Sequence, residues 1–145
     1  MKRLLKFTLT IVFVLSILCT PAYASDTATT DRVDYADGSY ALIIIHRELS
    51  RSSTSESKSY VYYNSSSVRC FSYTLTAEFT YNGRTSSADS CYATISRYDR
   101  DWDVDSHDEY TSGSTAYGSA VFSGPGGASR SVNLTLTCDK NGNVT

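Results

Sequence analysis

The chain has 145 residues, with 13 Lys and Arg against 15 Asp and Glu, and a formal net charge of −2 at pH 7. This balance disfavours binding to nucleic acids and anionic membranes, because both depend on clustered Lys and Arg. The 12 tyrosines favour β-structure, because aromatic side chains fit a pleated, half-buried surface.

The N-terminal segment 1–24 has the features of a secretory signal peptide. Three basic residues precede an apolar run over 9–18, and Ala22, Tyr23 and Ala24 match an A-x-A cleavage site. The apolar run is shorter than the roughly 20 residues that a membrane-spanning helix needs. We therefore expect cleavage near Ala24, a secreted or extracellular protein, and no membrane span in the mature form. Cleavage removes three of the 13 basic residues, so ten remain against 15 acidic residues.

The first part of the mature chain contains one strongly apolar segment. The polar segment 25–37 is expected to be a disordered lead-in. Residues 40–49 include three consecutive isoleucines, which favour a strand over a helix. Because this segment is continuously apolar, it predicts a central strand covered on both faces. A Ser-rich loop over 51–59 leads to a short strand over 60–63 and a turn over 64–67.

The clearest alternation of apolar and polar residues covers 69–81, which predicts a half-buried strand with one solvated face. Asn82 and Gly83 follow, and this pair is the strongest short-range hairpin signal. The segment 90–98 returns as a strand. A two-residue turn would place Cys91 opposite Thr74, unless the loop continues through Ser87 or a bulge shifts the register.

Two further strands are predicted over 115–123 and 129–138. They are joined by a Gly-Pro-Gly-Gly sequence in which Pro and Gly suit the centre of a type II turn. Centring the hairpin there places Tyr117 opposite Leu134. The polar tail 139–145 is expected to be flexible.

About six to seven short strands with turn signals between them predict a single all-β domain over 38–138. The favoured architecture is an antiparallel β-sandwich, Ig-like in its layering, with a small β-barrel as the second choice. This likeness is one of architecture and carries no function.

Three cysteines remain after cleavage: Cys70, Cys91 and Cys138. An exported protein favours an intramolecular disulfide, and an odd number leaves one thiol free or paired between chains. Cys91 and Cys138 each continue an inward-facing apolar series, so a Cys91–Cys138 disulfide is favoured. Cys70 is then free or an alternative partner, and a disulfide-linked dimer is a further option.

Carboxylates are concentrated in the segment 99–109 and suggest a calcium site, because Ca²⁺ prefers oxygen ligands. The candidate ligands are Asp101, Asp103 and Asp105. The spacing departs from an EF-hand loop, because Ser106 and Ser112 stand where that loop has Gly and Glu. The alternative is an edge strand with Trp102 and Val104 packed inward and solvated aspartates.

No catalytic motif rises above background in the sequence, although its many serines leave a Ser/His/Asp triad open. A nucleophile elbow is missing, and His46 is interpreted as a strand residue, because a catalytic triad is identified by geometry rather than by composition. The tyrosines suit a recognition surface, with half-buried strand positions as the alternative. The candidate surface residues are Tyr60, Tyr62, Tyr63, Tyr92 and Tyr98.

The sequence therefore favours a secreted, non-catalytic binding domain without a cofactor, whose partner is an extracellular protein or glycan. The alternatives are a Ca²⁺-stabilised structural module, a small secreted effector or toxin and, last, a small secreted hydrolase.

Overall fold

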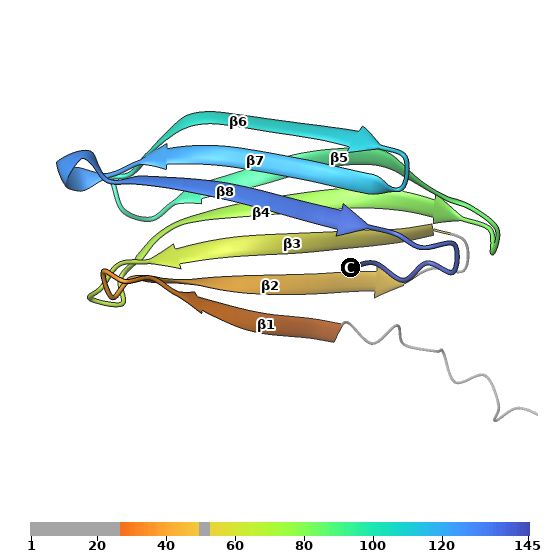
Figure 1. The fold of residues 1–145 in the computed structure, drawn as a ribbon, viewed down its shortest axis with the longest axis horizontal. Helices are drawn as coiled ribbons and strands as arrows, with labels where there is room; N and C mark the ends of the chain where they lie inside the picture. Colours follow the sequence, from red (N-terminus) through yellow and green to blue (C-terminus); the bar gives the residue numbers. More distant parts are fainter. Residues whose placement is uncertain (1–26, 50–52) are drawn as a thin grey trace, which may run out of the picture.

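Eight β-strands and one short 3-10 helix follow one another in the residues that the computed structural model describes, 27–49 and 53–145 (Figure 1). They are β1 (Thr27–Asp34), β2 (Tyr40–Leu49), β3 (Ser53–Tyr63), β4 (Arg69–Tyr81), β5 (Ser86–Arg97), β6 (Asp103–Ser112), β7 (Thr115–Ser123), η1 (Pro125–Gly127) and β8 (Ser129–Thr137). The expected signal peptide over 1–24 lies outside the described residues. Within them, no helix has the length and apolar character needed to cross a membrane.

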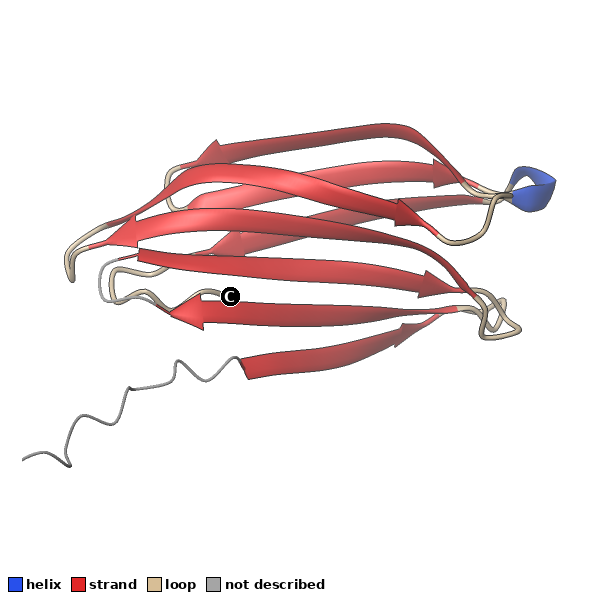
Figure 2. Ribbon diagram, turned by 180° about the vertical axis from the view of Figure 1, so that it is seen from behind, coloured by secondary structure: helices blue, strands red, loops and turns tan. Residues whose placement is uncertain are grey.

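Except at the β5–β6 connection, each strand pairs with the next strand in the chain, so the order of strands in both sheets follows the sequence. Strands β1 to β5 form sheet A, and strands β6 to β8 form sheet B; all pairs are antiparallel. The two sheets lie face to face, and the chain changes sheets between β5 and β6 (Figure 1, Figure 2). The predicted antiparallel sandwich is therefore confirmed. Its sequential order differs from the Greek-key connections of immunoglobulin domains, so the likeness to them is limited to the layering.

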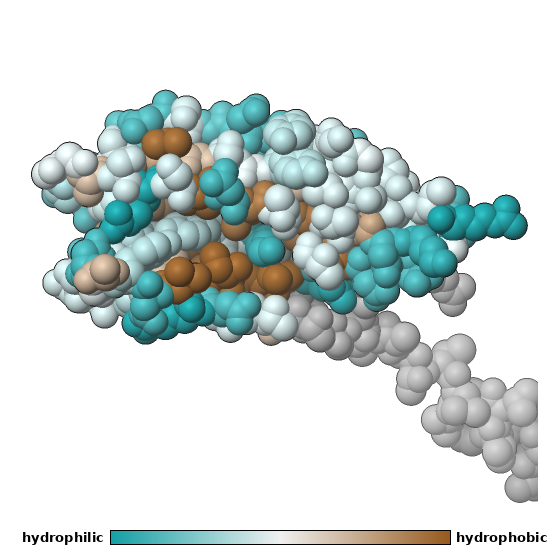
Figure 3. Space-filling view, viewed as in Figure 1, coloured by the Kyte–Doolittle hydropathy of each residue, from teal (hydrophilic) through white to brown (hydrophobic). Residues whose placement is uncertain are grey.

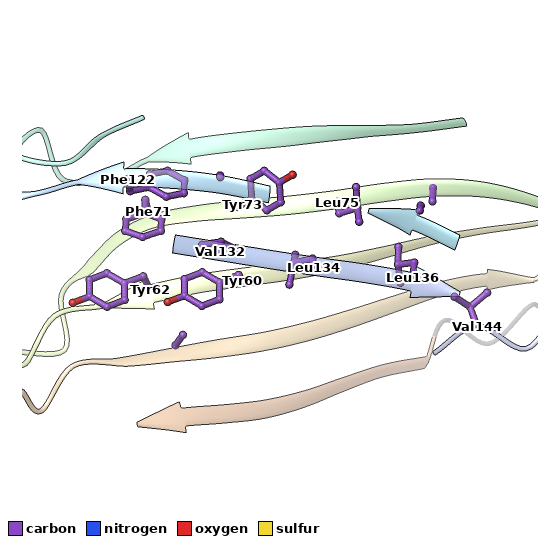
Figure 4. Close-up of a cluster of buried hydrophobic side chains, with 14 of the residues drawn as sticks. Tyr60, Tyr62, Phe71, Tyr73, Leu75, Phe122, Val132, Leu134, Leu136 and Val144 are labelled. Atoms are coloured by element: carbon purple, nitrogen blue, oxygen red, sulfur yellow. The ribbon is translucent and has the colours of Figure 1, made fainter. Parts of the chain in front are cut away.

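The core lies between β4 and sheet B. The inward side chains of β4, each at most 1% exposed, are Phe71, Tyr73, Leu75, Ala77 and Phe79. Phe71 stacks on Phe122 of β7 with ring centroids 3.8 Å apart, and Figure 4 shows the two rings facing each other. Full burial of one such side chain contributes about 1.5–3 kcal/mol, so this series holds the two sheets together.

The β4–β5 hairpin differs from the expected register. Its connection covers 82–85, and the register shifts between Glu78 and Phe79. As a result, Cys91 lies opposite Ala77. The pairing with Thr74 required a two-residue turn without a bulge; the longer connection and the bulge, which the sequence left open as the alternative, are what the structure contains.

The β7–β8 hairpin is displaced by one residue from the prediction. Leu134 lies opposite Gly118, and Tyr117 lies opposite Thr135. A shift of one residue moves a side chain to the other face of a sheet. Tyr117 therefore points away from the core and stacks on Tyr110, with ring centroids 4.8 Å apart.

Both segments expected to be disordered contain ordered structure. Within the predicted lead-in 25–37, β1 pairs with β2 along its whole length. In the predicted tail 139–145, the chain turns back so that Val144 bridges to Cys138 and is only 3% exposed. In both segments, backbone groups pair with the edge of an existing strand and so have hydrogen-bond partners. The polar composition of a segment does not reveal such pairing.

The apolar strand β2 is not covered on both faces. Sheet B packs over β3, β4 and β5, whereas β2 lies one strand from the outer edge of sheet A. Each residue of its apolar run, 42–45, is half-buried. The prediction of a central, doubly covered strand is therefore wrong, because sheet B has fewer strands than sheet A.

Candidate functional site

The five tyrosines predicted to form one binding surface lie on opposite faces of sheet A. Tyr60 and Tyr62 point into the core, where they are 6% and 3% exposed, and the Tyr62 ring centroid lies 5.1 Å from that of Phe71. Side chains alternate along a strand, so the other three candidates fall on the outer face. They are Tyr63, Tyr92 and Tyr98. Two of the five candidates thus belong to the core and three to a surface.

Arginine side chains cover part of the aromatic rings on this outer face. The Arg69 guanidinium carbon lies 3.8 Å from the ring centroid of Tyr98. The Arg32 guanidinium carbon lies 3.8 Å from that of Tyr40, and Tyr40 stacks on Tyr63 with centroids 4.8 Å apart. Exposed cation–π pairs contribute about 0.5–1 kcal/mol, so these contacts restrict how the rings move.

Hydroxyl groups occupy the face between the rings. The Ser59 and Thr74 hydroxyl oxygens lie 2.8 Å apart. One row of paired positions across β3, β4 and β5 consists of Ser59, Thr74 and Thr94, and the next consists of Ser57, Thr76 and Tyr92. Hydrogen bonding with Ser72 lowers the pKa of the Tyr98 hydroxyl, and the charge of Arg69 acts in the same direction. We call this outer face, with its three tyrosines and hydroxyl rows, the tyrosine face.

The tyrosine face adjoins a shallow depression at the connection between β5 and β6. Its lining residues are Arg97, Tyr98, Asp99 and Arg100. Tyr92 and Tyr98 are 56% and 50% exposed, so large areas of both rings are available to a ligand. His46 is also exposed, on β2 opposite Ser57 of the same face.

The candidate calcium ligands are Asp101, Asp103 and Asp105. The structure does not assemble them into a site: the Asp103 carboxylate pairs with Arg97 at 2.8 Å, and that of Asp105 accepts a hydrogen bond from Ser123 at 2.8 Å. Among the described residues, no group of three or more His, Cys, Asp or Glu side chains is arranged to hold a metal ion. Trp102 is 4% exposed and Val104 packs against the core, as in the alternative interpretation of this segment.

The predicted Cys91–Cys138 disulfide is absent, and the three cysteines of the described residues are free. Cys91 lies on β5, which packs under β6 and β7, whereas Cys138 follows β8, which packs over β3 and β4. The two cysteines therefore belong to different parts of the sandwich. Desolvation raises the pKa of all three thiols, including Cys70, which lowers their reactivity at neutral pH.

A hydrogen-bond chain that no sequence pattern predicted connects the two sheets. The Tyr73 hydroxyl donates to Glu109 Oε1 at 2.8 Å, and His107 Nδ1 lies 3.2 Å from both carboxylate oxygens of Glu109. Gly118 makes room, because a Cβ atom there would overlap the Tyr73 hydroxyl. Burial and the Glu109 contact raise the pKa of Tyr73. Tyr73 is fully buried, so its hydroxyl orders the core, whereas the His107 end of the chain is exposed at the surface.

Comparison with known proteins identifies no relative. No family model, no curated protein and no solved structure matches the chain. The function of this protein must therefore be inferred from its own geometry.

Proposed function

We propose that the protein is an exported, non-catalytic binding domain that recognises a glycan on its tyrosine face. The observation that carries the proposal is the position of two half-exposed rings, Tyr92 and Tyr98, among rows of Ser and Thr hydroxyls on one continuous sheet face. A sugar ring combines a face of C–H groups with a rim of hydroxyls. Aromatic rings contact the first, and side-chain hydroxyls donate to and accept from the second.

The composition of this face favours a glycan over a protein partner. The outward residues around Tyr92 are mainly Ser and Thr, unlike the apolar centre that protein interfaces use. The apolar residues of this outer face lie on β2 and β3 and are buried or half-buried: Leu42, Ile44 and Val61. The depression beside Tyr98 adds charged groups from Arg97, Asp99 and Arg100. A branch or a charged substituent of a polysaccharide fits such a rim.

The test is an array of immobilised microbial and animal polysaccharides probed with the secreted protein. We expect binding that is reduced at least about tenfold by the double substitution Tyr92→Ala and Tyr98→Ala, since each exposed aromatic contact at an interface contributes on the order of 1 kcal/mol. The matched control is Tyr110→Ala, because Tyr110 is 54% exposed but lies on sheet B.

Equal loss in the control, or a protein captured through the same two tyrosines while no glycan binds, contradicts a glycan function. Export is tested separately by the intact mass of the protein recovered outside the cell. We expect a mass that lacks residues 1–24, whereas a retained N-terminus contradicts export by signal cleavage.

A further inference from the structure

The inner face of β2 is an apolar surface over which sheet B provides no strand. Ile43 and Ile45 point to this side and are half-buried. On β1, Val33 pairs with Ala41 and is 42% exposed, and the exposed Asp31 pairs with Ile43 on the same face. The space-filling view shows hydrophobic surface along a hollow between β8 and β2 (Figure 3). We call this hollow, bounded by β8 above and by the inner faces of β1 and β2 below, the recess.

The edge of β8 that borders the recess presents backbone groups for strand pairing. Thr137 exchanges two hydrogen bonds with Thr145 on this side, each 3.0 Å long. Because backbone groups alternate along an antiparallel strand, the N–H and C=O groups of Thr135, Asn133 and Ser131 point the same way. No strand of the described residues pairs with them there. The recess therefore has both a hydrogen-bonding wall and a floor whose β2 part is apolar, with Asp31 of β1 at its outer margin.

The C-terminal residues show what kind of chain fits this position. Val144 bridges to Cys138 at the end of β8, and its side chain is 3% exposed. Its carbonyl oxygen accepts a hydrogen bond from Arg47 Nη2 of β2 at 2.6 Å. Residues 144 and 145 thus form the first positions of a fourth strand of sheet B, with an apolar side chain directed inward.

A basic side chain stands at the next position. Lys58 Nζ lies 3.4 Å from the carbonyl oxygen of Thr135, which is one of the groups that a fourth strand would use. An incoming N–H would replace this contact and leave the lysine cation facing the new strand. An acidic residue in that strand would then pair with Lys58.

The shape of the recess excludes the sheet edge of a second folded copy. Sheet A extends under the recess by two strands, which is about 10 Å of sheet width. Pairing the β8 edges of two copies would force the overhanging strands of both copies into the same space. A single extended segment has no such overhang and fits.

From these observations we infer that the recess binds an extended segment of a partner polypeptide. The segment is about six residues long, pairs with β8 as a fourth strand of sheet B, directs alternate apolar side chains onto Ile43 and Ile45, and carries one acidic residue for Lys58. This is β-strand addition, and it uses a surface distinct from the tyrosine face.

The test uses the secreted protein and a labelled peptide, acetyl-VTETVTV-amide, with fluorescence anisotropy as the readout. We expect saturable binding of the peptide. The Ile45→Asp substitution should weaken this binding at least about tenfold, because the new carboxylate would lie unpaired against the bound peptide. Ile44→Asp is the matched control, since it makes the same change on the neighbouring residue and the opposite face. Asn133→Pro, which removes one backbone donor at the β8 edge, gives a second variant with the expected loss.

Amide hydrogen exchange locates the peptide. Binding is expected to slow exchange at Ser131, Asn133 and Thr135 at least about tenfold, because each amide becomes hydrogen-bonded. The inference is overturned if the peptide does not bind at millimolar concentration or if these three amides are unaffected. It is also overturned if they are already protected by residues 1–26 of the unprocessed chain, or by a dimer that Ile45→Asp dissociates.

Discussion

Strands β4 and β2 are both rich in apolar residues, but they meet different surroundings. The inward residues of β4 lie under sheet B and are almost completely buried, as Phe71 and Leu75 show. The inward residues Ile43 and Ile45 of β2 are half-buried. The two strands belong to one sheet, so the difference comes from the opposite layer, which has three strands facing five.

This comparison separates two contributions of apolar residues. In β4 they fill the space between two layers, where packing is dense and each methyl group matters. In β2 they maintain a sheet whose apolar inner face is left available. Substitutions of inward residues should therefore lower the free energy of unfolding more in β4 than in β2. Within β2, substitutions on the inner and outer faces should differ in their effect on peptide binding.

The largest expected effect comes from Phe71→Ala. Because Phe71 is fully buried and stacked on Phe122, its removal leaves a cavity and should lower the free energy of unfolding by about 3–5 kcal/mol. Ile43→Ala, at a half-buried position, should cost only about 1–2 kcal/mol. Urea denaturation measures both values, and equal losses would contradict the difference between covered and uncovered strands.

Gly118→Ala tests how closely β7 approaches β4. The new Cβ would overlap the Tyr73 hydroxyl, so we expect a loss of about 1–3 kcal/mol in the free energy of unfolding, as for an overpacked core. The second change Tyr73→Phe removes the overlapping oxygen and should restore part of the loss. If the double variant shows simply additive losses in urea denaturation, the clash does not involve this hydroxyl.

The alternation along β4 was sufficient to predict its buried face, because a period of two determines which side chains point together. The same reasoning failed for β2, since the pattern in one strand does not reveal how many strands the opposite sheet contains. Tyr117 shows a second limit. The Pro125–Gly127 turn moves the hairpin register by one residue, and this reverses the side on which the tyrosine lies.

The candidate sites show a third limit of sequence reasoning. The number of carboxylates close to Asp103 in the sequence suggested a metal ligand. Its carboxylate instead pairs with Arg97, and this contact depends on the path of the chain from β5 to β6. Likewise, Cys91 and Cys138 share an inward direction but not a neighbourhood. The face to which a side chain points follows from the alternation along its own strand. Which other side chains lie near it depends on the order of strands in both sheets.

Glu56→Gln tests how burial affects the carboxyl group of Glu56, which lies on β3 opposite Arg47 of β2. Glu56 is 1% exposed, its Oε2 atom pairs with Arg47 Nε at 3.1 Å, and its Oε1 atom has no hydrogen-bond partner. Burial raises the pKa of this carboxyl above its ordinary value of 4.5, although Arg47 and Lys58 oppose the change. The folded protein therefore holds the Glu56 proton more tightly than the unfolded chain does.

The sign of the pH dependence follows from this raised pKa. Below pH 4.5 the carboxyl is protonated in both states, and glutamine should change stability little. As the pH rises through 4.5 and the higher folded pKa, ionisation destabilises the folded wild type, so the glutamine variant should become more stable than wild type. Urea denaturation at pH 4 and pH 7.5 measures the difference. A variant that is less stable at pH 7.5 than at pH 4, relative to wild type, would show that the Arg47 pair outweighs burial.

The smallest expected effect on stability comes from Tyr92→Ala on the outer face of β5. The ring is 56% exposed, so its loss should change the free energy of unfolding by no more than about 0.5 kcal/mol. Thermal and urea denaturation of this variant, with Tyr110→Ala as the equally exposed control, measure the change. A loss above about 1 kcal/mol lies beyond the range of surface substitutions and would show that the ring stabilises sheet A. Reduced glycan binding would then be explained by distortion of the tyrosine face. A small change together with lost binding assigns the ring to the ligand, because an exposed side chain that barely affects folding can lower affinity only through what it contacts.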